Sequence, residues 1–343
     1  KYNSTVGFSA SQILFSSDYI FGLKAAEQFL NLSKISITRS KAELVAQVSK
    51  AYYNVLINKE RLKLLDANIF RLKKILDDTK AYNKSGFVVL IDVERLEVQY
   101  NNVLSEKEKV VKLIELTENM LKFQMGFKIS DSINLTDSIN MNGEPTDDLS
   151  AAKVDVSKRP EFQLQSLLDI DVKRQKWGYM PSLVAYASHN YNAQRNTFNF
   201  LQFDDNDINK KWFKITLVGA TLNLNIFTGM QRVNRLQQAK IASQKNLNTL
   251  KNVELGAEIE ASAASISYVN AATTLRIQKK NSELAQHVYD VVQKKFESGL
   301  GNNLEIVTAE TSLKEAQTNY YNAIYDMIVA KIDYQKATGT LVK

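Results

Sequence analysis

Residues 296–310 read FESGLGNNLEIVTAE, and residues 83–97 read NKSGFVVLIDVERLE. In each stretch a Ser-Gly pair ends one helical pattern, and an acidic residue opens another a few residues later. The offset is about 213 residues, the separation of Gly86 and Gly299, which is too long for a solenoid unit. The sequence therefore indicates a duplicated helical hairpin, in which both glycines end a helix in the left-handed conformation.

Long helical patterns flank both turns. The first runs from about residue 19 to residue 84, and part of it has seam positions at alternating spacings of three and four, the period of a coiled coil. Within the helical pattern this seam runs from residue 44 to residue 76. With Asn58 as its only polar member, it comprises Leu44, Val48, Ala51, Val55, Asn58, Leu62, Leu65, Ile69, Leu72 and Leu76. A second long pattern covers about 230–297. Shorter return helices are expected to start near Asp92 and Glu305, where the helix dipole favours an acidic side chain.

Strand-like segments precede each long helix. Residues 2–15, 183–191 and 212–226 lack a helical period and are expected to be strands. A short helix is expected at about 159–176, and an exposed loop at 192–210, where Asn and Asp cluster.

Three parts follow from this order of elements. Residues 1–126 form the first repeat, which we expect to be N-terminally incomplete because the chain begins inside a strand pattern. Residues 127–157, rich in Asp, Ser and Asn, are expected to be a linker with one short strand and one short helix. Residues 158–343 form the second repeat, with a short helix, two strands and the second long hairpin.

Composition argues against several functions. The chain has no Cys, which excludes disulfides, thiolate metal sites and Cys nucleophiles. His189 and His287 fall in separate elements, and residues 204–207 lack EF-hand spacing, so no metal or cofactor is expected. No catalytic motif is present, and we expect no enzyme. The net charge of +7 comes from Lys and Arg interleaved with Asp and Glu, typical of solvated helix faces rather than a nucleic-acid-binding stripe.

The strands raise the question of a membrane. No apolar run reaches the roughly 18 residues that a membrane-spanning helix needs. A few strands cannot close a sheet alone, and an open sheet edge cannot lie in lipid, so strands in a membrane would require several protomers to share one barrel. Two alternatives remain open at this point: a soluble elongated helical scaffold that binds protein partners, and a basic coiled coil that binds nucleic acid.

The two turn stretches, together with the strand-to-helix junctions at residues 12–15 and 224–229, resemble those of the TolC family of outer-membrane efflux proteins. The resemblance covers nearly the whole chain. It implies a mainly helical fold with a small β part. Long hairpins would form a periplasmic α-barrel, and strands would contribute to a transmembrane β-barrel shared by a homotrimer. It also implies a collar at residues 127–157 and a loop at 192–210 that faces the exterior.

The resemblance further implies a function and a place for it. Members act as passive exit ducts in the outer membrane of Gram-negative bacteria, with a periplasmic adaptor and, indirectly, an inner-membrane pump as partners. It assigns adaptor docking to the tip turns, which comprise Gly86, Phe87, Val88, Gly299, Leu300, Gly301 and Asn302. It places Glu305 on an acidic constriction position and Asp92 on its counterpart in the other repeat. Thr308 stands where some members carry a second acid, which argues against a double acidic ring.

Overall fold

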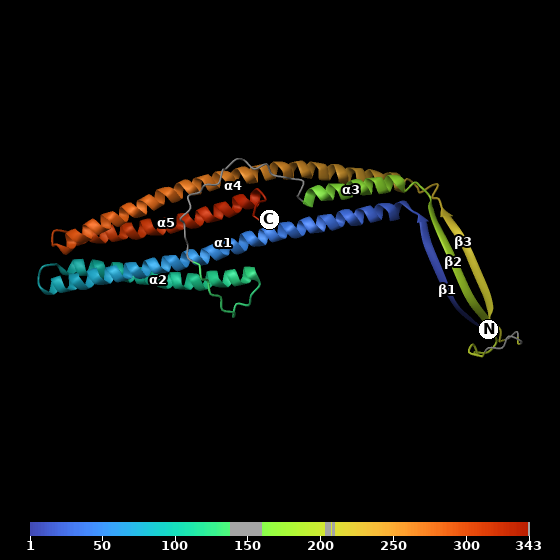
Figure 1. Ribbon diagram of the computed structural model, residues 1–343, viewed down its shortest axis with the longest axis horizontal. Helices are drawn as coiled ribbons and strands as arrows, with labels where there is room; N and C mark the ends of the chain where they lie inside the picture. Colours follow the sequence, from blue (N-terminus) through green and yellow to red (C-terminus); the bar gives the residue numbers. More distant parts are fainter. Residues whose placement is uncertain (138–159, 203–206, 208–209, 342–343) are drawn as a thin grey trace. The chain divides into compact units, whose positions relative to one another are not determined.

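The computed structural model describes residues 1–137, 160–202, 207 and 210–341. Two long helices dominate them: α1 (Ser17–Lys84) and α4 (Gln231–Glu297). Each is followed by a shorter return helix, α2 (Leu90–Met125) after α1 and α5 (Asn303–Ala337) after α4 (Figure 1). The two hairpins predicted from the repeated turns are therefore both present.

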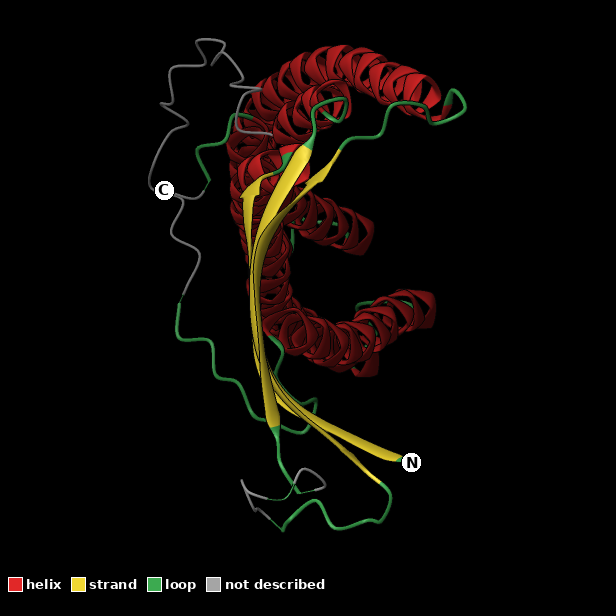
Figure 2. Ribbon diagram, turned by 90° about the vertical axis from the view of Figure 1, so that its right-hand side faces the viewer, coloured by secondary structure: helices red, strands yellow, loops and turns green. Residues whose placement is uncertain are grey.

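Three antiparallel strands form one sheet in the order β1 (Tyr2–Phe15), β2 (Ser182–Arg195) and β3 (Phe213–Asn223). Figure 1 shows β2 between the other two strands, and Figure 2 shows the three strands side by side in yellow. Because β1 belongs to the first repeat and β3 to the second, the sheet joins the two sequence repeats of one chain.

Two strand ends differ from the prediction. β2 extends to Arg195, which pairs with Tyr2, instead of ending at residue 191. Its polar residues continue the two-residue alternation, so they remain compatible with a strand. β3 ends at Asn223 rather than residue 226, because Asn223 already pairs with Ser182, the first residue of β2.

The polar segment after α2 is only partly described. Residues 127–137 contain neither helix nor strand. The rest of the predicted linker lies outside the described residues, as do residues 203–206 and 208–209 of the predicted loop. The predicted short strand and short helix of the linker thus remain expectations.

Contacts divide the chain into two compact units. The first comprises Lys1–Ser36 and Val156–Glu254 and holds the sheet. It also contains α3 (Pro160–Trp177), which confirms the predicted short helix. The amides of Gln165 in α3 and Asn246 in α4 hydrogen-bond at 3.0 Å. The Trp177 ring lies 6.1 Å from that of Phe21 in α1. α3 thus packs against the N-terminal part of both long helices.

The second unit comprises Ile37–Asp155 and Leu255–Lys343. At its hairpin-tip end, one apolar core draws on all four helices. Its most deeply buried members include Leu72 of α1, Leu96 and Val103 of α2, and Ile306 and Leu313 of α5. Fully burying such a side chain contributes roughly 1.5–3 kcal/mol.

Farther along the second hairpin a separate core pairs α4 with α5. Tyr268 of α4 stacks on Tyr334 of α5 with ring centroids 5.9 Å apart, and Met327 and Ala330 pack against them. The alternation of small and large residues along α5 therefore accommodates the aromatic side chain of the facing helix.

Candidate functional site: the two hairpin tips

The tip of the first hairpin is closed by a Schellman motif. Gly86 has φ 81°, its N–H donates to the carbonyl of Asn83, and the N–H of Phe87 donates to the carbonyl of Tyr82, both at 3.0 Å. The Asn83 side chain also donates to the carbonyl of Val88 at 2.7 Å. The predicted glycine cap is confirmed, and the turn is held by its own backbone.

The second tip repeats this arrangement and tightens it. Gly299 has φ 75°, and the N–H groups of Gly299 and Leu300 donate to the carbonyls of Phe296 and Lys295. The N–H of Gly301 also donates to the Lys295 carbonyl at 2.9 Å. A Cβ at Gly301 would lie 2.7 Å from the backbone nitrogen of Phe296. The fold therefore excludes a larger residue at Gly301 by contact, and disfavours one at Gly299 by its backbone conformation.

The return helices begin differently at the two tips. The Asn302 side chain caps α5 by accepting from the N–H of Leu304 at 2.9 Å. Val89 occupies the same position before α2 and makes no side-chain cap. The second tip thus has a self-contained helix start, while the first depends on its turn and on neighbouring helices.

The two tip surfaces also differ in polarity. The first exposes a run of large apolar side chains, Phe87 (82% exposed), Val89, Leu90 and Ile91. The second exposes Leu300 (84%) but otherwise carries small or polar residues in its turn. The family resemblance implied that both turns are contact surfaces, but it did not indicate this contrast in polarity.

Asp92 and Glu305 lie in the first turns of α2 and α5, as predicted. Asp92 is partly buried and faces the guanidinium of Arg95 at 3.5 Å. Glu305 is exposed, and its carboxylate has no hydrogen-bond or ion-pair partner among the described residues. The dipole of each helix N-terminus stabilises these charges by roughly 0.3–1 kcal/mol. Glu305 therefore offers a free negative charge at its tip, while that of Asp92 is partly neutralised.

Asn303 is a residue of this site that the sequence reasoning missed. It is only 7% exposed, and its Nδ2 donates to the backbone carbonyl of Asp92 at 2.9 Å. This bond ties the start of α5 to the start of α2. Its position in the sequence could have pointed to it. Asn303 precedes Ile306 by three residues, so it is a polar residue on the apolar seam of α5.

Among the described residues, no helix combines the length and apolar character required to cross a membrane. In the same part of the chain, no group of three or more His, Asp or Glu side chains is arranged to hold a metal ion.

Comparison with known proteins completes the description of the site. The family model "Outer membrane efflux protein" matches residues 164–340, more than half of the chain. The chain belongs to this family. It is 22% identical over 354 residues to the outer membrane protein TolC of Vibrio cholerae, covering 98% of this chain and 77% of that one.

Two further comparisons agree. An antibiotic efflux pump outer membrane protein of Pseudomonas putida, ArpC, is 20% identical, with 99% of this chain and 69% of ArpC covered. The Campylobacter jejuni CmeC outer membrane channel superposes with a TM-score of 0.79 at 12% identity. That superposition covers all of this chain and 78% of CmeC, and at this identity it shows the fold alone.

Family membership confirms the TolC-like resemblance. The protein is an outer-membrane exit duct of a Gram-negative bacterium, in a family of transport channels rather than enzymes. This family membership favours a channel over the two alternatives, a soluble scaffold and a nucleic-acid-binding coiled coil.

Proposed function

We propose that three copies of this chain assemble into one duct through which a tripartite efflux or secretion system exports its cargo. The sheet supports this assembly. Within the described residues β1 and β3 each pair with β2 on one side only. An unpaired edge in lipid would leave a row of N–H and C=O groups unsatisfied, and pairing between copies removes it. The outer-membrane location therefore favours a barrel shared between protomers.

We propose that the duct is gated at the hairpin tips. One observation carries this proposal. α2 and α5 each have an acidic residue in the first turn, and the hydrogen bond from Asn303 to the Asp92 carbonyl holds the starts of these two helices side by side. Three copies around an axis would then bring together several carboxylates at one level. Rings of acidic side chains at a constriction favour cations. Glu305, whose charge has no partner among the described residues, would dominate this effect.

The tips also suit the docking of a periplasmic adaptor, which would link the duct to an inner-membrane pump. Relatives named as parts of efflux pumps support such partners. The turns are held by their own backbone hydrogen bonds, so they would present a preformed surface. Exposed Phe87, Val89 and Leu90 would supply apolar contacts, and the exposed Asn302 polar ones.

Electron microscopy of the detergent-purified protein tests the assembly. We expect threefold particles with one end in the detergent micelle. Monomeric particles without a micelle would contradict the trimeric duct.

Planar-bilayer recording tests the gate. We expect Asp92→Asn/Glu305→Gln to lower the preference for cations measured by reversal potentials. Glu115→Gln serves as the control, since Glu115 is an exposed acid in α2, far from the tip, whose ion-pair partner among the described residues is nearby Lys112. Unchanged selectivity in the double variant would remove both residues from the gate.

A further inference from the structure

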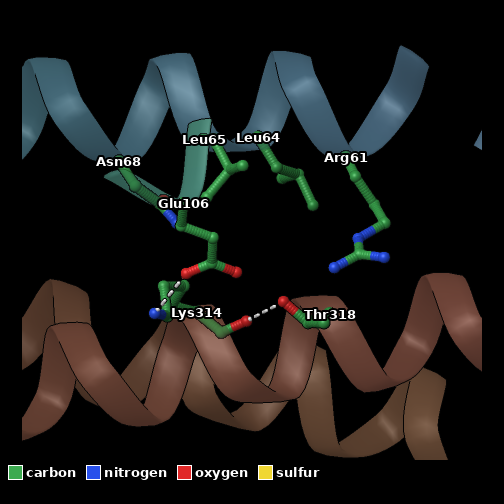
Figure 3. A pocket seen from close by; sticks show the side chains of 7 residues that line it. All are labelled: Arg61, Leu64, Leu65, Asn68, Glu106, Lys314 and Thr318. Atoms are coloured by element: carbon green, nitrogen blue, oxygen red, sulfur yellow. Dashed lines mark hydrogen bonds and ion pairs between the residues drawn. The ribbon is translucent and has the colours of Figure 1, made fainter. Parts of the chain in front are cut away.

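The cavity between α1, α2 and α5 admits little more than water. Figure 3 shows this space, which measures about 10 Å³, roughly the room of one water molecule. Two of the polar side chains that line it, Glu106 and Lys314, already pair with each other at 2.9 Å. A larger molecule therefore needs an open surface, and the sheet provides one.

The two faces of the sheet differ in polarity. One face carries hydroxyl and amide side chains on β1 and β2, namely Asn3, Thr5, Ser9, Ser11, Ser188, Asn190 and Asn192. The opposite face is apolar at the end that adjoins the helices, with Gln12 as the polar exception. Its cross-strand neighbours there are Ala10, Ala187 and Val218, then Ala185 and Ala220, then Leu183 and Leu222. A transmembrane barrel turns its apolar face to lipid, so this face is the outward one in the proposed barrel.

Polar side chains follow the apolar ones on the outward face, farther from the helices. The next two cross-strand pairs are His189 with Thr216 and Tyr191 with Lys214. His189 Nδ1 and Thr216 Oγ1 hydrogen-bond at 2.7 Å. The Tyr191 ring meets the His189 ring edge-on at 5.1 Å, and Lys214 Nζ lies 5.6 Å from the centre of the Tyr191 ring. These four residues form one group, which we call the rim cluster.

The level of Lys214 corresponds to the edge of a membrane. β3 ends at Asn223, so Leu222 lies at the helix-side end of the lipid-facing band. Lys214 precedes Leu222 by eight residues, which is about 27 Å along a strand and about 20 Å along the axis of a barrel whose strands tilt by about 40°. The lipid-facing band of such barrels is about 25 Å tall, and a lysine on it is costly at the midplane but tolerated near the boundary. Lys214 therefore lies near the boundary remote from the helices.

The side-chain pattern of β3 supports the same boundary. Between Phe213 and Leu217 the apolar side chains of β3 lie on the face opposite Lys214. The apolar side of the strand thus changes just beyond Val218. We conclude that the lipid-facing band of β3 ends there and that the rim cluster begins at headgroup level.

The rim cluster has unused capacity for an anion. Lys214 is exposed and makes no ion pair among the described residues, where Nε2 of His189 also has no hydrogen-bond partner. Lys211, three residues before Lys214, is exposed too. A free ammonium group at headgroup level attracts phosphate. The neighbouring rings of His189 and Tyr191 offer flat surfaces on which the apolar face of a sugar can pack.

We propose that the rim cluster binds the phosphorylated sugar headgroup of a glycolipid in the outer leaflet of the outer membrane. The proposal rests on the proposed barrel, which places the strand ends remote from the helices at the outer surface. Lys214 pairs with a phosphate, and His189 and Thr216 contact sugar hydroxyls. The contact fixes the depth of each copy in the membrane. All four residues belong to one chain, so one copy holds a complete site.

Binding of purified lipid A, a sugar with two phosphates and several acyl chains, tests the site. Native mass spectrometry of the delipidated protein in detergent measures its dissociation constant. We expect Lys214→Met to raise this constant about tenfold or more, because a hydrogen bond between charged groups is lost. Lys214→Arg keeps the charge and should stay within about threefold. Lys173→Met is the matched control, since Lys173 is an exposed lysine of α3 without an ion pair among the described residues, and it should bind like the unmodified protein.

Unchanged affinity in Lys214→Met, or an equal loss in Lys173→Met, would overturn the proposal. Equal affinity for phosphatidylglycerol would overturn the choice of a glycolipid, and so would displacement of lipid A by inorganic phosphate at equal concentration. If Lys214→Met does not fold, His189→Phe tests the same cluster, because it keeps a ring but removes both nitrogens. We expect it to weaken binding by about threefold or more, and unchanged binding would again refute the site.

Conductance in planar bilayers separates this proposal from the duct itself. A protein that conducts, but binds lipid A without any dependence on Lys214, would refute the rim cluster alone. A protein that forms no channel would refute the proposed duct.

Discussion

Replacing Arg71 with Met should be costly, and the cost should depend on pH. The substitution leaves Glu310 without its cation in a site where its side chain is 2% exposed. Burial already raises the pKa of Glu310 above the usual 4.5, and Arg71 counteracts that rise. Without Arg71 the carboxyl would take up a proton, because protonation costs less than an unpaired buried charge.

The free energy needed to protonate Glu310 limits the loss of stability in Arg71→Met. Protonating a carboxyl of ordinary pKa 4.5 at pH 7 costs about 3.4 kcal/mol, at roughly 1.36 kcal/mol per pH unit. The loss of unfolding free energy in Arg71→Met should therefore be about 3 kcal/mol at pH 7. A folded-state pKa above the unfolded one means that stability is lost as pH rises, so the defect should shrink on acidification from pH 7 to pH 5. The change is at most about 1.4 kcal/mol per pH unit, because the raised pKa of Glu310 in the native protein already gives part of the same dependence.

Denaturant titration of the protein in detergent, followed by far-ultraviolet circular dichroism, measures this effect. Arg71→Met/Glu310→Gln is the matched control, because it removes both charges and should show a smaller, pH-independent defect. A defect in Arg71→Met that does not change between pH 5 and pH 7 would refute the reasoning. So would a defect below about 1 kcal/mol at pH 7, the usual range of an exposed pair.

Three other predictions concern the tips and the helix surfaces. Gly299→Ala should lower stability by about 1–2 kcal/mol because Gly299 has φ 75°. Gly22→Ala, in the interior of α1 with open space around it, should instead raise stability by about 0.5–1 kcal/mol. Thermal unfolding would reveal the opposite signs, and shifts in the same direction would contradict them. Asp333→Asn breaks an ion pair with Lys50 whose side chains are 42% and 32% exposed, so denaturant titration should detect a loss below about 1 kcal/mol. A loss near that of Arg71→Met would show that exposure does not decide the strength of these pairs.

Sequence patterns identified the helices and their turns well because those features are local. Gly86 and Gly299 adopt the left-handed conformation that a Ser-Gly helix end indicates, and the seam positions Leu65, Leu72 and Leu76 are buried. Strand ends were less predictable. β2 continues to Arg195 because Tyr2, far away in the sequence, provides a partner.

Tip chemistry that depends on the relative rotation of helices could not be predicted. Glu310 was recognisable as the repeat of Glu97, yet their surroundings differ. Glu97 is exposed and lies 3.5 Å from Lys80, 17 residues away, whereas Glu310 is buried against Arg71, 239 residues away. Asn303 shows the same limit, because its partner is a backbone carbonyl that carries no sequence signal.

The pairing of β1 with β2 also constrains how the protein matures. Tyr2 pairs with Arg195 and Phe15 with Leu183, so β1 must wait until most of the intervening chain has emerged and been exported. Contacts so distant in sequence form late and leave a strand exposed to misassociation. Ser4, Thr5, Ser9 and Ser11 along β1 keep it polar during that interval. Biogenesis, as well as the finished barrel, would then select the composition of this strand.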